Sequence, residues 1–368
     1  MNRELGIGLA GYGAIGRMHA LCYRMLPLAY PDLPVTARIV AVATAGATSA
    51  ERARRELGVE ATTDLGTLLS HSGVAAIDCC VPTGDHARIA HAALLAGKAL
   101  FCEKPLAASA EEATQIAMLA RQRGLVGGVN YHFRQVPAIQ EARRGIEAGL
   151  LGEVYGFHMR YYRSSSLRRD RPLTWRFAGP GSGVLADLGS HLIDLALHLL
   201  GPIDAVAAHM RTVVAERPGP DGRPAPVEAD DAAWLDIELA GGGRGTIAAS
   251  KLVPGAADDL RIEAHGSRGA LLYDSRDPNT LHVAESGDAP VGGTSVATLS
   301  RTQPPAALPG PETPTGVIQW HLASIAAFLQ AYATGAQPYA SLDAGLMVDR
   351  VIAAARRSAG ADGAMVRV

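Results

Sequence analysis

The first 130 residues alternate between short apolar runs and longer stretches with helical periodicity. The apolar runs predict buried strands at 5–10, 38–43, 76–81, 99–102 and 126–129. The intervening periodic stretches predict helices at 14–26, 49–57, 85–96 and 109–123. Ser49 and Ser109 are expected to cap two of these helices, with Glu112 completing a capping box. Alternation of this kind predicts an α/β, doubly wound parallel sheet.

Beyond residue 130 the pattern changes to period-two alternation. It predicts strands at 154–162, 205–214, 232–239, 245–251, 260–265 and 270–273. Helical patterns predict helices at 136–148, 187–200, 317–334 and 342–357. Two stretches rich in Pro and Gly, 217–226 and 287–314, are expected to be surface loops. Successive strands joined by short turns indicate an α+β domain with a largely antiparallel, open sheet.

The change of pattern divides the chain into two predicted domains. A length of 368 residues is sufficient for two hydrophobic cores. We expect a doubly wound domain at 1–130 and an α+β domain at 131–368, whose C-terminal helices can pack back on the first domain.

Composition narrows the possible surroundings and partners. The chain is 48% apolar and 19% charged, as in ordinary globular proteins, and its net charge of −2 gives no reason to expect nucleic acid or a membrane surface as partner. No apolar run reaches membrane-spanning length, and the first strand starts too early to leave room for a signal peptide. The four cysteines lack metal-ligand spacing, so we expect no metal and free buried thiols at Cys22, Cys79, Cys80 and Cys102. A cytoplasmic location follows as the expectation.

A glycine-rich turn connects the first strand to the first helix. It reads Gly11-Tyr12-Gly13-Ala14-Ile15-Gly16. Gly11 permits the tight turn, Gly13 lets the backbone approach a pyrophosphate, and Gly16 allows close packing of the helix on the strand. The helix N-terminus adds free N–H groups and a positive dipole end. The turn and its position predict a dinucleotide-binding site.

A lysine directly follows the buried strand at 99–102. The segment reads Glu103-Lys104-Pro105, and ligands of parallel sheets bind beyond the carboxyl ends of the strands. Pro105 restricts Lys104 to extended backbone geometry. A surface turn with two solvated charges is the alternative for this segment alone.

A second set of polar residues lies in the helical pattern at 187–200. Asp187, His191 and Asp194 are spaced four and three residues apart, which places them along one helical face. A histidine titrates near neutral pH and can exchange the proton of an alcohol, while a carboxylate holds its tautomer. Taken alone, the pattern more often indicates a charge cluster at the start of a helix with a structural histidine.

Taken together, these segments resemble the glucose–fructose oxidoreductase / inositol dehydrogenase / MocA family over nearly the whole chain. The resemblance rests on five segments in order: Gly11–Gly16 with His19, Val81-Pro82-Thr83 with His86, Glu103-Lys104-Pro105-Leu106, Asn130-Tyr131-His132-Phe133-Arg134, and Gly183 with Asp187–His191 and Asp194. It implies a Rossmann domain, then an α+β domain whose open sheet serves homodimer or homotetramer contacts. It also implies NAD(P)-dependent hydride exchange with a secondary alcohol or ketone of a sugar, inositol or related polyol.

The resemblance also implies a role for particular residues. Lys104 would hydrogen-bond the reacting oxygen, His191 would be the general acid/base, and Asp187 would bind a substrate hydroxyl or orient that histidine. Glu103 would face the nicotinamide ribose, and Pro105 would follow a cis peptide bond. The remaining cofactor contacts would come from Pro82, Thr83, His86 and Asn130.

The cofactor is expected to be NAD or NADP. The second strand ends at Thr44, where an NAD-preferring member would usually carry an acid for the ribose hydroxyls. No arginine follows immediately; the nearest are Arg17, Arg52, Arg54 and Arg55. The missing acid therefore allows NADP and favours it slightly.

The substrate is the least defined part of the prediction. An arginine-rich segment precedes the histidine helix, including Arg163, Arg168, Arg169, Arg171 and Arg176. It suits a carboxylated, phosphorylated or nucleotide-linked sugar, or forms a solvated basic loop. Trp175 and Arg176 are the preferred substrate contacts here, with Tyr131 and Arg163 as further candidates. His321 either faces the substrate or belongs to the core or surface.

Two other classes share the same motifs. A redox-neutral enzyme uses tightly bound NAD for transient oxidation during elimination or glycoside cleavage. A dinucleotide-sensing regulator has the fold without the chemistry. Such a regulator has no need to keep Lys104, Asp187 and His191 together, which favours an enzyme.

Overall fold

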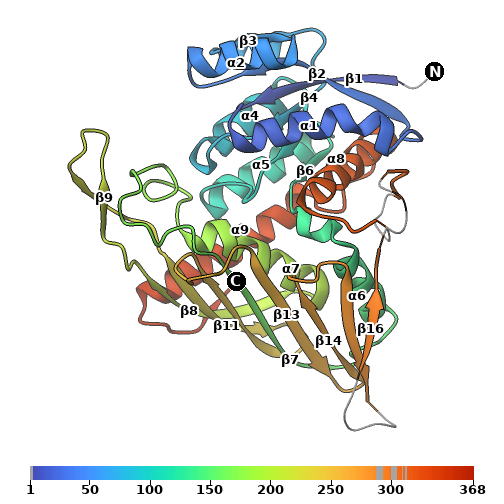
Figure 1. Cartoon of the computed structure of the whole chain (residues 1–368), viewed down its shortest axis with the longest axis vertical. Coiled ribbons are helices and arrows are strands. Elements are labelled where there is room, and N and C mark those ends of the chain that lie inside the picture. The colour runs from blue at the N-terminus through green and yellow to red at the C-terminus, as the bar shows by residue number, and fades with distance from the viewer. Residues whose placement is uncertain (1–2, 287–292, 300–304, 309, 311–312) are drawn as a thin grey trace. The chain divides into compact units, whose positions relative to one another are not determined.

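The computed structural model describes residues 3–286, 293–299, 305–308, 310 and 313–368. The chain divides into two compact units (Figure 1). The first contains Met1–Gln135 and Thr302–Leu346, and the second contains Val136–Arg301 and Met347–Val368. Strands and helices alternate along the first unit, whereas most strands of the second follow one another directly.

The first unit is built on a six-stranded parallel sheet in the order β3-β2-β1-β4-β5-β6. Its strands are β1 (Arg3–Ala10), β2 (Val35–Ala43), β3 (Glu60–Thr62), β4 (Ala76–Cys79), β5 (Ala99–Cys102) and β6 (Gly127–Val129). The three strands β4, β5 and β6 are buried throughout, because helices cover both faces of such a sheet. The predicted doubly wound parallel sheet is confirmed.

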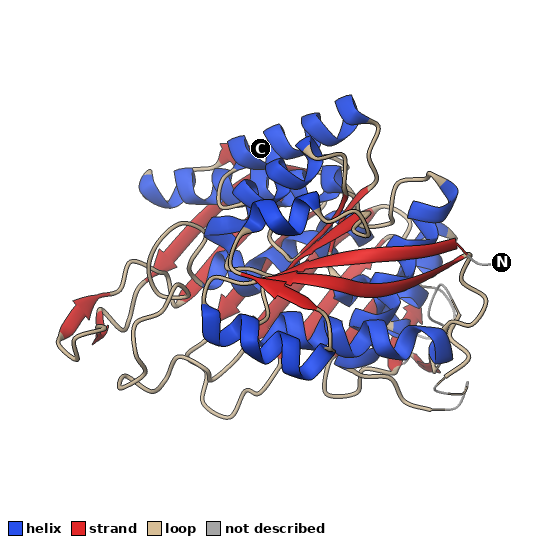
Figure 2. Cartoon of the chain, turned by 90° about the horizontal axis from the view of Figure 1, so that it is seen from above, coloured by secondary structure: helices blue, strands red, loops and turns tan. Residues whose placement is uncertain are grey.

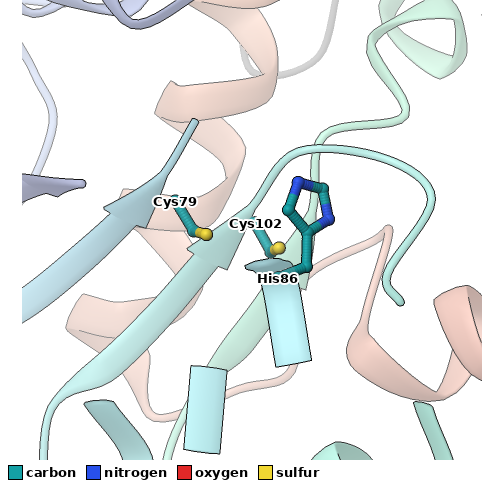
Figure 3. Close-up of side chains that lie close together, drawn as sticks. All are labelled: Cys79, His86 and Cys102. Atoms are coloured by element: carbon teal, nitrogen blue, oxygen red, sulfur yellow. The ribbon is translucent and has the colours of Figure 1, made fainter. Parts of the chain in front are cut away.

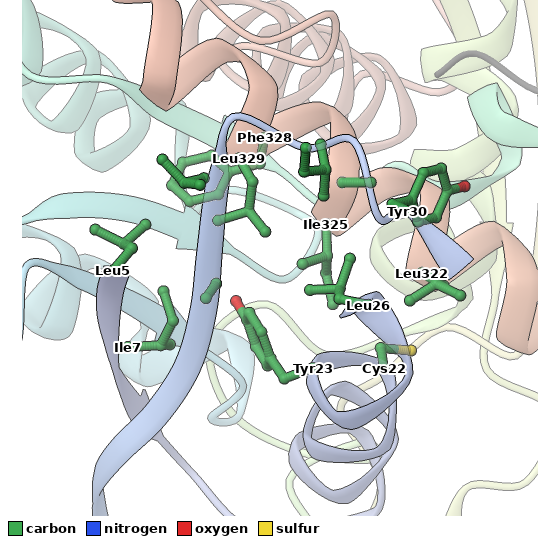
Figure 4. Packing of buried hydrophobic residues seen from close by; sticks show 14 of the residues in the cluster. Leu5, Ile7, Cys22, Tyr23, Leu26, Tyr30, Leu322, Ile325, Phe328 and Leu329 are labelled. Carbon is green, nitrogen blue, oxygen red and sulfur yellow. The ribbon is translucent and has the colours of Figure 1, made fainter. Parts of the chain in front are cut away.

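Six helices among the described residues belong wholly to the first unit, and Figure 2 shows helices running beside strands. They are α1 (Ala14–Ala29), α2 (Ala47–Leu57), α3 (Leu65–Ser70), α4 (His86–Leu95), α5 (Ala110–Arg123) and α8 (Val317–Thr334). Short 3₁₀ turns at Thr83–Asp85 and His132–Gln135 follow β4 and β6. Although α8 is distant in sequence, it packs against α1, and Leu26 belongs to the same buried cluster as Ile325, Phe328 and Leu329 (Figure 4).

Helix caps in this unit confirm Ser109 as an N-cap, place the Glu112 carboxylate on the N–H before that cap instead of on the Ser109 N–H, and correct the prediction for Ser49. The Ser109 hydroxyl accepts a hydrogen bond from the Glu112 backbone at 3.2 Å, and the Glu112 carboxylate accepts one from the Ala108 N–H at 3.2 Å. Ser49, by contrast, lies inside α2, whose N-cap is Gly46. The helix begins earlier because Ala47 and Thr48 join it despite their weak periodic signal. The short β3 and α3 have no clear hydrophobic period, so the sequence does not predict them.

The second unit contains a nine-stranded mixed sheet in the order β16-β15-β14-β13-β7-β12-β11-β8-β17. Its strands are β7 (Val154–Tyr162), β8 (Ile203–Arg211), β11 (Ala232–Leu239), β12 (Arg244–Ser250), β13 (Asp259–Gly266), β14 (Gly269–Asp274), β15 (Thr280–Glu285), β16 (Thr294–Ala297) and β17 (Val366–Arg367). Every neighbouring pair is antiparallel except β7 and β12. Helices α6 (Pro137–Glu147) and α7 (Ser190–Leu200) pack on it, and α9 (Leu342–Gly360) completes the chain's helices among the described residues.

Three predictions for the second unit need correction. The stretch 217–226 contains a hairpin of β9 (Glu216–Pro218) and β10 (Pro224–Pro226), which tolerates its three prolines because all of them sit at strand ends. The stretch 287–314 contributes β16, while 287–292, 300–304, 309 and 311–312 lie outside the described residues. The helix predicted from 187 begins instead as a π-helical segment, Leu185–Gly189, which leads into α7.

Candidate functional site

The glycine-rich turn of the first unit has an open backbone surface. Gly11 has φ of +95°, which disfavours other residues. A Cβ on Gly16 would lie 2.1 Å from the Gly11 carbonyl oxygen, whereas a Cβ on Gly13 would meet nothing within 4 Å. Gly13 caps α1 without a side-chain hydrogen bond, so the first N–H groups remain available to a ligand. The turn therefore fits a pyrophosphate group.

The segment after β5 forms the second part of this edge. Glu103 is 8% exposed, and its Oε1 accepts a hydrogen bond of 2.6 Å from Asn130 Nδ2. Lys104 is half-buried, and the peptide bond between Lys104 and Pro105 is cis, as the family resemblance implied. Both Glu103 and Asn130 directly follow strands of the sheet, so they meet at its carboxyl edge.

A buried histidine lies between two carboxylates at this edge. His19 Nδ1 is 2.8 Å from Asp78 Oδ2, and its Nε2 is 3.3 Å from Glu103 Oε1. Burial lowers the pKa of His19, but the Asp78 carboxylate outweighs it and raises that pKa well above the ordinary value. Burial likewise raises the pKa of Glu103, but the hydrogen bond from His19 and its charge hold that pKa well below the usual range. We interpret His19 as a buried imidazolium.

Asn130 extends this network toward α8. Its Nδ2 lies 2.9 Å from His321 Nδ1 and 3.1 Å from His19 Nε2. Burial and the charge of His19 lower the pKa of His321 to about 4, and its ring stacks on that of His132 at 4.2 Å. His321 is thus a neutral core residue. Asn130 Oδ1 is buried without a hydrogen-bond partner among the described residues, which leaves an acceptor for a ligand at this edge.

The predicted cofactor residues near β2 and β4 are buried or hydrogen-bonded to neighbouring residues. Thr44 follows β2, is 7% exposed, and its hydroxyl donates to the Gly46 carbonyl at 2.9 Å. Tyr12 donates from its hydroxyl to Glu56 Oε2 at 2.9 Å. Pro82 precedes the 3₁₀ turn that contains Thr83, which is 5% exposed. All of them belong to loops at the carboxyl edge of the sheet or directly support one.

Two of the four arginines nearest to Thr44 in the sequence, Arg17 and Arg54, contact other groups. Arg17 Nε lies 3.1 Å from Glu56 Oε2. Arg54 donates to the Ala61 carbonyl at 2.5 Å and to Glu51 at 2.9 Å. Neither guanidinium is available for a 2′-phosphate in this arrangement, so these contacts do not add to the case for NADP.

Three potential metal donors, Cys79, His86 and Cys102, lie close together near this edge of the sheet (Figure 3). The His86 ring nitrogens already lie 2.8 Å from the Pro105 carbonyl oxygen and 3.0 Å from that of Val81. The contact with Cys79, together with burial, raises the pKa of the Cys102 thiol well above its ordinary value. Zinc prefers thiolates and a free imidazole nitrogen, so we assign this group a packing role. His86 holds the loop that contains the cis bond.

The second unit contains Asp187 and His191. Asp187 lies in the π-helical segment with a side chain 33% exposed, whereas His191 follows in α7 and is 4% exposed. Asp194, one turn further, is 1% exposed. Lys251 Nζ lies 2.7 Å from Asp187 Oδ2 with its side chain 8% exposed. Sequence reasoning missed Lys251, because a single lysine at a strand end carries no motif.

An aromatic residue lies beside the histidine. The ring of Tyr161, on β7, meets the His191 ring edge-on at 6.2 Å between centroids. Its hydroxyl donates to Asp258. Burial, followed by the Asp258 carboxylate, raises the pKa of Tyr161 well above its ordinary value. Tyr161 is therefore a neutral side chain that supports the ring of His191.

Two arginines of the arginine-rich segment are paired with aspartates of their own unit. Arg163 Nε lies 3.6 Å from Asp258, and Arg168 pairs with Asp170 at 2.7 Å. The guanidinium of Arg176 lies 4.3 Å from the centre of the Trp175 ring, on a face that a sugar would otherwise use. Trp175 is 40% exposed. The segment offers less positive charge than its composition suggests.

A buried arginine fastens this segment. Arg217 is 1% exposed and donates to the carbonyl oxygens of Ser166 at 2.8 Å and Arg168 at 2.7 Å. Its guanidinium also lies 4.0 Å from the centre of the Phe177 ring. Tyr131, the remaining substrate candidate, is in the first unit and is 1% exposed.

None of the helices in the described part of the chain combines the length and apolar character needed to span a membrane.

Comparisons with known proteins cover both units. The model "Oxidoreductase family, NAD-binding Rossmann fold" matches residues 5–131, and the "GFO/IDH/MocA C-terminal domain" matches 139–272. Levoglucosan dehydrogenase of Pseudarthrobacter phenanthrenivorans is 32% identical over 302 residues, which make up 78% of this chain and 77% of that protein. Inositol 2-dehydrogenase of Rhizobium meliloti is 28% identical over 279 residues, 75% of this chain and 78% of that protein.

Solved structures give the same result at the level of the fold. A levoglucosan dehydrogenase in complex with NADH and levoglucosan is 30% identical, covers 100% of this chain and 99% of its own, and superimposes with a TM-score of 0.94. An oxidoreductase domain protein from Kribbella flavida is 33% identical, with the same coverage and a TM-score of 0.92. The similarity therefore includes the whole length of this chain.

Proposed function

The chain belongs to the Gfo/Idh/MocA family of NAD-binding oxidoreductases and is a dehydrogenase acting on CH–OH groups, and on that premise we propose that its substrate is an uncharged sugar or cyclic polyol. The paired arginines of the second unit support the uncharged substrate, and the carboxyl edge of the six-stranded sheet supports the nicotinamide cofactor. There an open Gly13, the Glu103–Lys104 pair and the buried acceptor of Asn130 follow strands of one unit.

These residues fit a nicotinamide dinucleotide. The uncapped N-terminus of α1 and the space at Gly13 suit its pyrophosphate, and Asn130 Oδ1 suits a ligand N–H. When bound, the nicotinamide supplies the hydride acceptor. The ionised Glu103 would accept hydrogen bonds from ribose hydroxyls, and His19 keeps it ionised.

The chain's own residues then need to transfer one proton and to stabilise the negative charge that develops on the reacting oxygen. His191 removes the proton of the reacting hydroxyl as general base. Lys104 donates a hydrogen bond to the reacting oxygen and stabilises its developing negative charge. Asp187 binds a neighbouring hydroxyl or orients His191. The burial of His191 supports its part, since a histidine shielded from water is held in one orientation.

Charge at the substrate segment favours an uncharged substrate. An acidic or nucleotide-linked sugar requires guanidinium groups free to pair with it. Arg163 and Arg168 are instead paired with aspartates, and Arg217 donates hydrogen bonds to main-chain carbonyl oxygens. Levoglucosan, the substrate named for the relative that is 32% identical, is uncharged and is the first compound to test.

A screen of substrates tests this proposal. Levoglucosan, L-sorbose, myo-inositol, a sugar acid and a nucleotide sugar would each be offered with NAD⁺ or NADP⁺, or with the reduced cofactor for the ketose. Nicotinamide absorbance would be followed throughout. We expect net nicotinamide reduction with an uncharged cyclic substrate and none with the acidic ones. Conversion of a sugar without net nicotinamide reduction would favour the redox-neutral alternative instead. Activity confined to acidic sugars would contradict the assignment of substrate charge.

A further inference from the structure

Lys251 forms a close pair with the carboxylate that the proposed mechanism places beside the histidine. It directly follows β12, and its Nζ lies 2.7 Å from Asp187 Oδ2. Its side chain is 8% exposed, so the ammonium is almost entirely removed from water. A lysine is rarely buried to this extent unless its charge is paired.

The main chain around Lys251 is fixed on both sides. Its N–H donates to the Asp231 carbonyl at 3.1 Å, and its carbonyl accepts from the Ser166 N–H at 3.0 Å. The π-helical segment that contains Asp187 packs against β12. Both partners are thus held by backbone contacts within one unit, and π-helical segments occur frequently at functional sites.

Composition adds an independent observation. Lysine occurs at only three positions, Lys98, Lys104 and Lys251, and the rest of the 34 lysine and arginine residues are arginine. One of the three is the residue proposed to stabilise the reacting oxygen. Arginine is planar with five donors, whereas lysine places a compact charge at one point. A chain that uses arginine almost throughout retains lysine at 251, where a single carboxylate oxygen is the target.

We propose that Lys251 is a positioning residue, which fixes the Asp187 carboxylate in orientation and keeps it ionised while His191 exchanges the proton. This inference rests on the proposed dehydrogenase function for its catalytic meaning. Lys251 acts through Asp187 and has no contact with the reacting atoms in this account. Because the ammonium stabilises the charged form of Asp187, the substrate's proton goes to His191.

Other charged groups around Asp187 enter the pH dependence. Tyr161 on β7 stays neutral, and the charge of Asp187 contributes to its raised pKa. Asp230 accepts from the Leu185 N–H at 2.8 Å, and burial raises its pKa, against the charges of Arg356 on α9 and of Lys251. Lys251 is a cation that pairs directly with Asp187.

Lys251→Met tests the proposal because it keeps the length of the side chain and removes the charge. We expect kcat to fall about tenfold or more, as loss of one partner of a buried ion pair does. The acid limb of the pH profile should move to higher pH, while the dissociation constant for NADH stays unchanged. Lys251→Arg should restore part of kcat. Lys98→Met is the matched control, since Lys98 donates to the Val74 carbonyl and lies away from both parts of the site.

A double variant separates positioning from a merely structural role. If Lys251 acts through Asp187, Lys251→Met added to Asp187→Asn should lower kcat little further. Full additivity, or an unmoved pH profile in a folded Lys251→Met protein, would overturn the proposal.

A measurement that does not depend on turnover tests the role of Lys251 even if the proposed function is wrong. In protein labelled with ¹³C at aspartate carboxyls, the Asp187 signal, identified by its loss in Asp187→Asn, should titrate at higher pH in Lys251→Met. An unchanged titration would refute the assignment even if no substrate were found. A wild-type protein inactive on every sugar would refute the dehydrogenase proposal and leave this titration to decide on Lys251.

Discussion

Replacing His19 by glutamine removes the cation that lies between two buried carboxylates. His19 is fully buried, and its ring contacts Asp78 at 2.8 Å and Glu103 at 3.3 Å. Glutamine keeps hydrogen-bonding capacity but carries no charge. Removing one partner of a buried ion pair typically costs about 3–5 kcal/mol, so we expect a loss of this size in the free energy of unfolding.

The pH dependence of this loss follows from two shifted groups. The pKa of His19 is raised in the folded state, so its contribution is complete below about pH 6.5 and is lost as pH rises through the folded-state value. The pKa of Glu103 is lowered, so its contribution is present above about pH 4.3 and is lost as pH falls through its folded-state value. The stability difference between wild type and His19→Gln should therefore be largest between these limits and narrow toward alkaline pH.

Urea denaturation of both proteins across this pH range measures the difference. His71→Gln is the matched control, because His71 is partly exposed and should change stability little. Adding Asp78→Asn to His19→Gln should recover part of the loss, since it neutralises one stranded carboxylate. A loss below about 1 kcal/mol near pH 6, or a double variant less stable than His19→Gln, would refute the buried imidazolium.

Two further changes test the cofactor site and the core. Thr44→Asp should move the NAD/NADP preference about tenfold or more toward NAD, because a carboxylate accepts hydrogen bonds from ribose hydroxyls and repels a 2′-phosphate. Steady-state kinetics with both cofactors would measure this preference. An unchanged ratio would place the adenine ribose away from Thr44. Phe328→Ala should cost about 3–5 kcal/mol of unfolding free energy, because this ring is 1% exposed and packs 5.1 Å from Phe101. Val317→Ala on the same helix, at an exposed position, should change stability by less than about 0.5 kcal/mol, and equal losses would contradict the packing argument.

Long elements with a clear period were predictable from the sequence. The strands Val154–Tyr162 and Ala232–Leu239 and the helix Val317–Thr334 have the predicted bounds. Each buries one face or side over many residues, so its pattern repeats often enough to define both ends. The short β3 and the prolines of β9 and β10 give no such repetition, since tertiary pairing alone makes them strands.

The candidate site was predictable where a motif carried it. The glycine-rich turn and the cis bond before Pro105 are found as expected. The roles of His19 and Lys251 depend on partners 59 and 64 residues away in the chain, Asp78 and Asp187, which no local spacing reveals. The pairing of Arg163 with the distant Asp258 is hidden in the same way, whereas Asp170 stands two residues from Arg168 in the sequence.

The central claim concerns Lys104 and His191, and one comparison of variants tests it most directly. Turnover of the best substrate from the screen would be measured for Lys104→Ala and His191→Ala, beside the dissociation constant for NADH. We predict that each variant loses about 10² or more in kcat and binds NADH nearly as wild type does, because each residue acts on the reacting oxygen or its proton. Near-normal kcat in either variant would contradict its assigned role and with it the account of catalysis given above.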